Sequence, residues 1–527
     1  MMSKEVSRRN FLKSTAIAGA AVMSAGALLG MPKQAWAQTP QYGGKLKFAI
    51  ADSPLSFDPA YNASQYTARW LGFLLFDTLT FQTADMKIVP NLATSWKVVD
   101  KGGAWVFDLR KGVTFHNNRE LTAKDVADHF NRVMDPKSGS HVAAALFPLK
   151  NAEIMDQYTV KLNLTSAYAD FPVTVAKPDA AIIALESAGR ETKNPLGTGP
   201  FKLKEFVPGE KVLFEKNPKY WKKGLPYLDS IEWLNIPDPA TQVSALLSGQ
   251  IDSFPELSKD YFEVLKKNNK IVVEEIPTGA HQPVVMQMSK KPFNDPRVVK
   301  AIKYCLDREK FVELVLNGHG VAANDVAVPP TDPFYHGIPL RKQDYALAKK
   351  LLAEAGYPNG LDLELITSEV RVNMVPTALT LKDMCAPAGI RINVKMAPPD
   401  TFWTEVWRVK PFFVGNWVGR PTIHDTLYPF FHKNSFDWNN PGGAKDKFND
   451  CHLYNPTLSD LLDMGMSEMN DEKRRGIYKM SQAVIMEEGG YITPYVANYI
   501  MARRANVHGL VPHPLKISDF STVWKSA

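Results

Sequence analysis

Cysteine is scarce in this chain, and the commonest sequence signals of catalysis are missing. The three cysteines, Cys305, Cys385 and Cys451, are far apart and odd in number, so they allow at most one disulfide. The sequence does not choose a pair, and three buried thiols are an equally good interpretation. Neither His-Glu-x-x-His nor Gly-x-Ser-x-Gly occurs, so nothing indicates a zinc protease or an α/β hydrolase.

The chain also lacks a long apolar run after its first 37 residues and a strong excess of charge. We therefore expect no membrane-spanning helix in the mature protein. The net charge is +7, but residues 1–37 contain five basic residues and one acidic residue, which leaves about +3 for the remainder. Such a balance is not typical of a nucleic-acid-binding protein. With 527 residues, 45% of them hydrophobic, the chain can form a large core.

The N-terminal segment is predicted to be a cleaved export signal. Residues 7–13, Ser-Arg-Arg-Asn-Phe-Leu-Lys, match the twin-arginine pattern, and an apolar stretch rich in small residues follows at 16–31. Ala35-Trp36-Ala37 then provides a cleavage site. The stretch is short and precedes that site, so a membrane anchor is the weaker interpretation. We expect export to a bacterial periplasm after removal of residues 1–37.

Periodicity and capping signals predict alternating strands and helices. We expect strands at 45–50, 105–110, 158–164, 361–366 and 390–396, and helices from 68 to about 77 and at 376–386. Thr122 followed by Asp125 is typical of a capping box, and Asp295 and Asp344 are expected to begin two further helices. Gly197-Thr198-Gly199 is predicted to be a structural turn, because no phosphate-loop lysine follows it. The alternation in the second half favours an α/β lobe.

Six blocks in colinear order resemble the periplasmic solute-binding proteins of ABC importers, solute-binding protein family 5, which carry peptides, nickel and opines. The blocks are VPNLATSW (89–96), FDLRKGVTFH (107–116), LTAKDV (121–126), GTGPF (197–201), FNDPRVVKAI (293–302) and AKKLLAEAGY (348–357). Together they extend over nearly all of the mature chain.

This resemblance implies an α/β, two-lobed binding protein of type II, in the large cluster, with the ligand cleft between the lobes. Lobe I would comprise residues 38–282 and 496–527, with an inserted subdomain at about 85–195, and lobe II residues 283–495. The implied partners are a small-molecule or peptide ligand and an inner-membrane ABC permease. We expect a monomer without cofactor, metal, nucleic acid or catalytic activity.

The loop at 415–425, Gly-Asn-Trp-Val-Gly-Arg-Pro-Thr-Ile-His-Asp, is the best candidate for a ligand contact. Its glycines predict a sharp turn or a close backbone approach. The guanidinium of Arg420 beside Trp417 suits a carboxylate, because its fork of donors binds two oxygens. In dipeptide-binding relatives this loop carries an aspartate for the peptide amino terminus. Arg420 in that place predicts an anionic group of the ligand instead. Asp425 either orients the arginine, which is the favoured interpretation, or contacts a ligand amine.

Other candidate contacts have competing structural interpretations. Tyr61 is either a cleft residue or a core aromatic, and Arg371 is either a second anion partner or a solvated loop residue. Trp403, with Trp407 four residues later, is more typical of a core than of a ligand wall. His424, His432 and His452 follow no metal-ligand spacing.

Two other functions stay open from the sequence. The tryptophans 403, 407, 417 and 438 could stack on an oligosaccharide, and the resemblance also allows a nickel chelate. An exported hydrolase built on the same lobes is the less favoured alternative, since the sequence shows no nucleophile–base pair.

Overall fold

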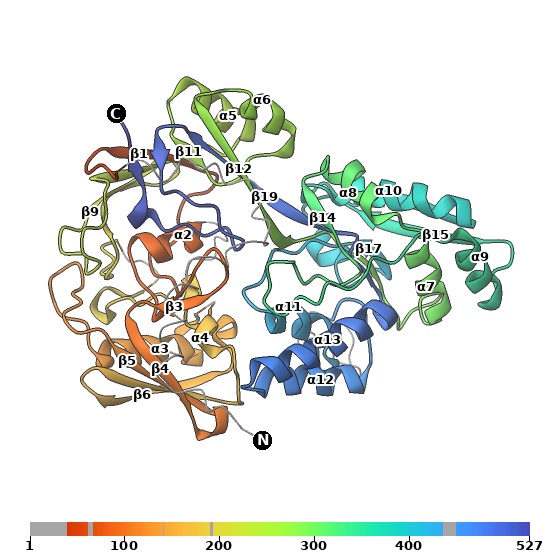
Figure 1. The fold of residues 1–527 in the computed structure, drawn as a ribbon, viewed down its shortest axis with the longest axis horizontal. Coiled ribbons are helices and arrows are strands. Elements are labelled where there is room, and N and C mark those ends of the chain that lie inside the picture. Colours follow the sequence, from red (N-terminus) through yellow and green to blue (C-terminus); the bar gives the residue numbers. More distant parts are fainter. Residues whose placement is uncertain (1–38, 62–66, 141, 190–192, 436–448) are drawn as a thin grey trace, which may run out of the picture. The chain divides into compact units, whose positions relative to one another are not determined.

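The computed structural model describes residues 39–527 apart from 62–66, 141, 190–192 and 436–448 (Figure 1). The predicted signal segment and Trp438 therefore lie outside the described residues. Residues 41–527 form one compact unit. Within the described part, no helix combines the length and the hydrophobicity that a membrane crossing requires.

The largest sheet contains the first strand of the described chain, and most of its strands belong to the proposed lobe I. Its strand order is β12-β19-β11-β1-β10-β9-β8, and β14 also pairs with β19. β1 is parallel to β10 and β11, and the other pairings are antiparallel. The strands are β1 (Lys45–Ile50), β8 (Phe201–Val207), β9 (Lys211–Lys216), β10 (Ser230–Asn235), β11 (Ser253–Phe254), β12 (Ile271–Ala280), β14 (Gly320–Ala322) and β19 (Tyr495–Arg504).

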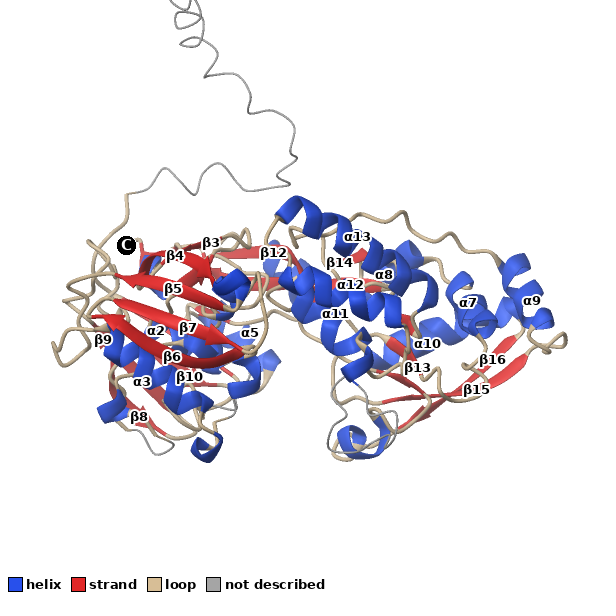
Figure 2. Ribbon diagram, turned by 90° about the horizontal axis from the view of Figure 1, so that it is seen from below, coloured by secondary structure: helices blue, strands red, loops and turns tan. Residues whose placement is uncertain are grey.

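A second, antiparallel sheet lies within the segment predicted to be an inserted subdomain. Its order is β4-β5-β7-β6, and these strands run side by side in Figure 2. Helix α3 packs against them, and its buried residues Val126 and Phe130 join the core of this sheet. The strands are β4 (Ala93–Val99), β5 (Ala104–Leu109), β6 (Leu149–Asp156) and β7 (Thr159–Leu164). Lobe I helices are α2 (Thr67–Leu74), α3 (Ala123–Met134), α4 (Phe171–Thr174), α5 (Pro239–Ser248) and α6 (Phe262–Lys266).

Lobe II is built on a five-stranded sheet with the order β16-β15-β17-β13-β18. The strands are β13 (Val284–Met286), β15 (Leu361–Thr367), β16 (Ile390–Met396), β17 (Phe412–Val414) and β18 (Tyr491–Ile492). The helices are α7 (Pro296–Tyr304), α8 (Arg308–Leu316), α9 (Tyr345–Glu354), α10 (Met374–Cys385), α11 (Ile423–Phe431), α12 (Pro456–Ser467) and α13 (Asp471–Glu488). All three cysteines are buried here as free thiols.

Two of the chain segments that connect the two large sheets are neighbours, and the chain also returns to the largest sheet at β14. The first leaves β12 for β13, and the second leaves β18 for β19. They lie side by side because β12 and β19 are antiparallel neighbours, from Ile271 opposite Arg504 to Ala280 opposite Ala497. The proposed boundaries near residues 283 and 496 stay a prediction, since β14, which lies between them in sequence, pairs with β19 of the largest sheet. Small two-stranded sheets, β2 (Thr80–Gln82) with β3 (Ile88–Pro90) and β20 (Val507–His508) with β21 (Trp524–Lys525), complete the strands.

The local capping predictions are confirmed. Asp295 and Asp344 accept the backbone N–H groups of Arg297 and Leu347 at 2.9 and 2.8 Å, at the starts of α7 and α9. The carboxylate of Asp125 accepts the backbone N–H of Thr122 at 2.9 Å, as a capping box requires. These signals depend on residues two or three apart, which is why the sequence reveals them.

The first predicted helix ends earlier than expected. α2 stops at Leu74, whereas the apolar stretch predicted a helix to about Asp77. The next residues bond to a distant turn instead: the N–H of Gly199 donates to the carbonyl of Leu75 at 3.1 Å. The Thr198 hydroxyl donates to the buried carboxylate of Asp77 at 2.9 Å. A tertiary contact therefore replaces the last helical turn.

The turn at Gly197–Gly199 tolerates no side chain. A Cβ on Gly197 would lie 1.9 Å from the carbonyl oxygen of Leu75, so we expect Gly197→Ala to lower the free energy of unfolding by about 1–3 kcal/mol. Gly476, in the exposed interior of α13, is the matched control because a Cβ there meets nothing within 4 Å. Gly476→Ala should raise stability by about 0.5–1 kcal/mol. Urea denaturation of both variants checks the opposite signs, and equal effects would contradict the close packing.

Candidate ligand-binding site

A cavity of about 530 Å³ is lined by both proposed lobes. Its volume lies within the range of small-molecule sites. Lobe I contributes Tyr168, Lys177 and Asp179 among others, and lobe II contributes residues 418–421, His424 and Asp425. The loop that the sequence singled out thus forms one wall.

Backbone pairing with the connection between the lobes positions this loop. The N–H of Trp417 donates to the carbonyl of His281 at 2.9 Å, and the N–H of His281 donates to the carbonyl of Trp417 at 3.0 Å. Just beyond, a Cβ on Gly419 would lie 3.1 Å from the backbone nitrogen of Gly279. The close approach expected from the glycines is therefore present at Gly419. The loop ends where Thr422 caps α11 by accepting the N–H of Asp425 at 3.0 Å.

Arg420 lines the cavity and lies against aromatic rings. Its guanidinium carbon is 5.6 Å from the ring centroid of Trp417 and 5.7 Å from that of Phe430. Aromatic faces attract a cation without using its N–H donors, so the side chain can be held in place while donors remain directed elsewhere. A partly buried guanidinium in such a setting is suited to a planar anion.

Trp417 stands behind Arg420 in an aromatic cluster rather than among the residues that line the cavity. Its ring centroid lies 4.5 Å from that of Phe430 and 6.0 Å from that of Trp407. Trp407 in turn meets Trp403 edge-on at 5.8 Å. The structure therefore gives Trp417 the position of a support for Arg420.

The buried carboxyl of Asp450 ties this cluster together. It accepts hydrogen bonds from the Tyr491 hydroxyl at 2.8 Å and from Trp407 Nε1 at 3.3 Å. Burial raises the pKa of Asp450 to about 7, although these hydrogen bonds and Arg408 act in the opposite direction. The folded protein thus holds a proton that the unfolded chain releases near pH 4.

This pKa predicts a pH-dependent contribution to stability. The stabilisation is complete below about pH 4 and is lost as the pH rises through about 7, by at most about 1.4 kcal/mol per pH unit. We expect wild type to lose stability relative to Asp450→Asn between pH 4.5 and 7.5, as measured by urea denaturation. A stability difference that is the same at both pH values would contradict a neutral Asp450.

Asp425 points to lobe I. Its Oδ2 lies 3.3 Å from Nζ of Lys177, which precedes the short 3-10 helix Pro178–Ala180. Burial opposes the charge on Asp425, but the positive charges of Lys177 and Arg420 help to bring its pKa below the ordinary value. The carboxylate is therefore ionised and interacts with a cation from each lobe. The orienting role predicted for Asp425 toward Arg420 stays a prediction.

Three other predicted contacts lie away from the cavity-lining residues. The Tyr61 hydroxyl donates to the carbonyl of Ser138 at 2.9 Å and packs on the subdomain core. Arg371 is exposed, and its guanidinium lies 5.7 Å from the ring centroid of Trp403, which packs on the core of lobe II. Their roles as ligand contacts stay predictions that the cavity does not support.

Sequence reasoning missed Lys177 and Tyr168. Both come from loops of lobe I whose local sequence has no motif. Lys177 meets Asp425 across 248 residues of chain, and only the fold brings them together.

The histidines do not gather into a metal site. Ring nitrogens of His432 and His452 lie near Asp463 and Ser289, respectively, and His424 lies at the cavity. Among the described residues, no group of three or more His, Cys, Asp or Glu side chains could hold a metal ion.

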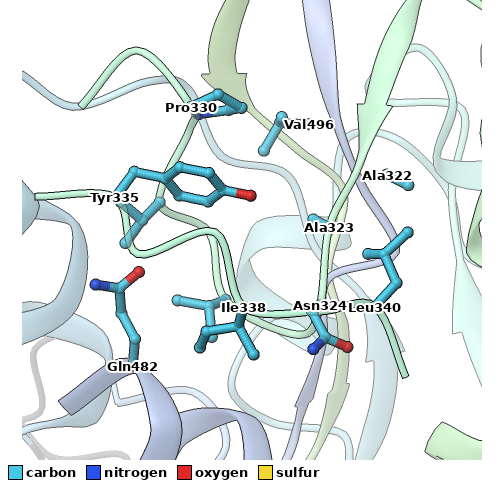
Figure 3. A pocket seen from close by; sticks show the side chains of 11 residues that line it. Ala322, Ala323, Asn324, Pro330, Tyr335, Ile338, Leu340, Gln482 and Val496 are labelled. Carbon is cyan, nitrogen blue, oxygen red and sulfur yellow. The ribbon is translucent and has the colours of Figure 1, made fainter. Parts of the chain in front are cut away.

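A much smaller cavity, of about 20 Å³, lies beside β14 and β19 (Figure 3). The side chains around it, including Tyr335, Ile338 and Val496, are mostly apolar. This space suits about one water molecule and no solute.

The two proposed lobes also contact each other outside the cavity. Nη2 of Arg474, on α13, lies 2.6 Å from Oδ1 of Asp170 at the start of α4, and both side chains are almost fully buried. The N–H of Ala169 donates to the carbonyl of Met466 at 2.9 Å, and Met466 joins the core of the subdomain. The two proposed lobes therefore touch through these residues as well as around the cavity.

Comparison with known proteins places this geometry in a family. The family model "Bacterial extracellular solute-binding proteins, family 5 Middle" matches residues 87–438. The chain is 26% identical over 472 residues to the glutathione-binding protein GsiB of Escherichia coli (strain K12), covering 88% of this chain and 90% of that protein.

Solved structures agree with the fold. The periplasmic binding protein DppA of Helicobacter pylori, in complex with the peptide STSA, is 25% identical with a TM-score of 0.75, over 92% of this chain and 99% of that one. HbpA2 of Haemophilus parasuis is 24% identical with a TM-score of 0.81, over 92% and 100%. The predicted two-lobed α/β fold is confirmed. The family model matches well over half of the chain, and the protein belongs to the family 5 bacterial extracellular solute-binding proteins, the substrate-binding components of ABC importers.

Proposed function

We propose that this protein is exported by the twin-arginine route, loses residues 1–37, and acts in the periplasm as a monomeric receptor that delivers its solute to an inner-membrane permease. The signal pattern at 7–13 and the Ala35-Trp36-Ala37 site support the export step. Membership of the family supports the partnership with a permease.

The proposed cargo is a small zwitterionic or anionic solute, such as a short peptide, an opine or a peptide-like acid. One observation carries this proposal: Arg420 lines the cavity between the lobes with aromatic rings behind it. Glutathione and the peptide STSA, named for two relatives, both carry carboxylates.

Lobe closure would trap the solute. A ligand that touches Arg420 on lobe II and the lobe I wall gains contacts only when the lobes are together, so it favours the closed state by its differential affinity. The double connection through β12 and β19 gives such a movement a defined axis.

An oligosaccharide has less support, because Trp403, Trp407 and Trp417 are not among the cavity-lining residues. A catalytic role has one observation in its favour. The hydroxyl of Ser289 lies 2.7 Å from Nδ1 of His452. Neither residue lines the cavity, so we propose a receptor without enzymatic activity. If the background esterase and peptidase activities of Ser289→Ala equal those of wild type, that result would agree with the proposal.

A thermal-shift panel tests the cargo. Carboxylate solutes, beginning with glutathione and the peptide STSA, are compared with their amides and with neutral oligosaccharides. A true ligand at a hundred times its dissociation constant should stabilise the protein by about 2.7 kcal/mol. Native mass spectrometry of protein purified from the periplasm would identify a retained solute. Stabilisation by sugars or free nickel alone would contradict an anionic cargo.

A further inference from the structure

An ion pair at the wall of the cavity joins the two proposed lobes. Lys177 of lobe I and Asp425 of lobe II both line the cavity, with Nζ 3.3 Å from Oδ2. Nζ of Lys177 also donates to the carbonyl of Ala145 at 3.2 Å, which fixes the ammonium on the lobe I wall. The pair therefore lies at the cavity wall, where its two charged groups can meet a bound solute.

Two cations and a helix N-terminus favour a negative charge at the position of Asp425. Lys177 faces it from lobe I, and Arg420 from the preceding loop lines the same cavity. Asp425 is also in the first turn of α11, where the helix dipole favours negative charge. The neighbouring Tyr168 and Asp179 line the same wall of lobe I, and His424 is held neutral at ordinary pH, because burial lowers its pKa to about 4. This corner is a built anion position, and a carboxylate of the protein fills it.

We propose that the carboxylate of Asp425 stands in for the carboxylate of the ligand, bridging Lys177 and Arg420 and drawing the lobes together until a solute carboxylate replaces it. Lys177 is then the lobe I anchor of the cargo, and specificity rests on two cations, one from each lobe. This inference rests on the proposed function in naming the cargo, but the bridge itself can be tested without any cargo.

The experiment is chemical rescue with acetate. Asp425→Ala removes the stand-in carboxylate while keeping the backbone N–H that Thr422 accepts. The variant should show a larger radius of gyration by small-angle scattering and a lower melting temperature than wild type. Sodium acetate at tens of millimolar should restore both, whereas sodium chloride at the same ionic strength should not.

Matched variants separate a specific anion position from general destabilisation. Lys177→Met alone should open the lobes as Asp425→Ala does, and the double variant should no longer respond to acetate. The charge exchange Lys177→Asp with Asp425→Lys should recover compactness in part. Equal acetate responses in Asp425→Ala and in the double variant, or wild-type compactness in both single variants, would overturn the inference.

The outcome is independent of the cargo panel. If no carboxylate solute binds wild type but acetate rescues Asp425→Ala alone, the proposed cargo fails and the bridge stands. If glutathione or the peptide STSA binds, Asp425→Asn should tighten it about threefold or more, because the competitor is neutral, and Lys177→Met should weaken it about tenfold. Weaker binding in Asp425→Asn would overturn the stand-in role in favour of an orienting one.

Discussion

Replacing Arg420 with alanine is expected to remove most of the affinity for a carboxylate solute. Arg420 lines the cavity with Trp417 and Phe430 against its guanidinium. Truncating one partner of a desolvated charge pair costs about 2–4 kcal/mol, which corresponds to a roughly 30- to 700-fold rise in the dissociation constant. Isothermal titration of the solute found by the panel measures this directly.

A second variant of Arg420 shows whether binding depends on the two-donor geometry of the guanidinium or on its charge alone, and a variant of Arg371 provides the control. Arg420→Lys keeps the charge and loses the bidentate geometry, so its affinity should fall between wild type and Arg420→Ala. Arg371→Ala is the control, because Arg371 is exposed and is not among the cavity-lining residues. A change below about threefold in Arg420→Ala, or an equal loss in Arg371→Ala, would place the anion contact elsewhere.

Replacing Arg474 with methionine should open the lobes. In the closed arrangement the change leaves the carboxylate of Asp170 buried without its partner, which costs about 3–5 kcal/mol. Opening gives that carboxylate access to water, so the protein should relieve the cost by separating the lobes. We expect a larger radius of gyration in small-angle scattering and at least tenfold weaker binding, because a ligand must now work against the opening.

The surface pair Arg391–Asp362 provides the control. Its Nε–Oδ1 distance is also 2.6 Å, but the side chains are 55% and 77% exposed. Arg391→Met should therefore leave both the stability and the lobe arrangement close to those of wild type, because solvent screens an exposed pair. Adding Asp170→Asn to Arg474→Met should restore closure in part, since no unpaired charge is then buried. Wild-type compactness in Arg474→Met would contradict this role of the pair.

The features of the fold that the sequence could predict are those that depend on interactions between residues close together in the chain. The caps at Asp295 and Asp344 need only neighbouring residues, and both form as expected. The end of α2 could not be predicted in this way. Leu75 bonds to Gly199, far along the chain, and this contact competes successfully with one more helical turn.

In the candidate site, too, the sequence predicts local backbone features but not which side chains distant elements bring together. The glycines of the 415–425 loop predict a close backbone approach, and Gly419 indeed lies against Gly279. Whether an aromatic faces a ligand or a core depends on the packing of distant elements. Tyr61 illustrates this, because its hydroxyl reaches the carbonyl of Ser138 rather than the cavity. Lys177 carries no sequence signal at all, and only tertiary structure places it opposite Asp425.

A crystal structure of the protein with the solute that it retains from the periplasm is the most direct test. We predict a carboxylate of that solute within about 2.7–2.9 Å of the guanidinium nitrogens of Arg420, accepting two hydrogen bonds. A ligand amine or neutral hydroxyl at that position, or a guanidinium that points away from the bound solute, would contradict the assignment of Arg420 as the anchor of an anionic cargo.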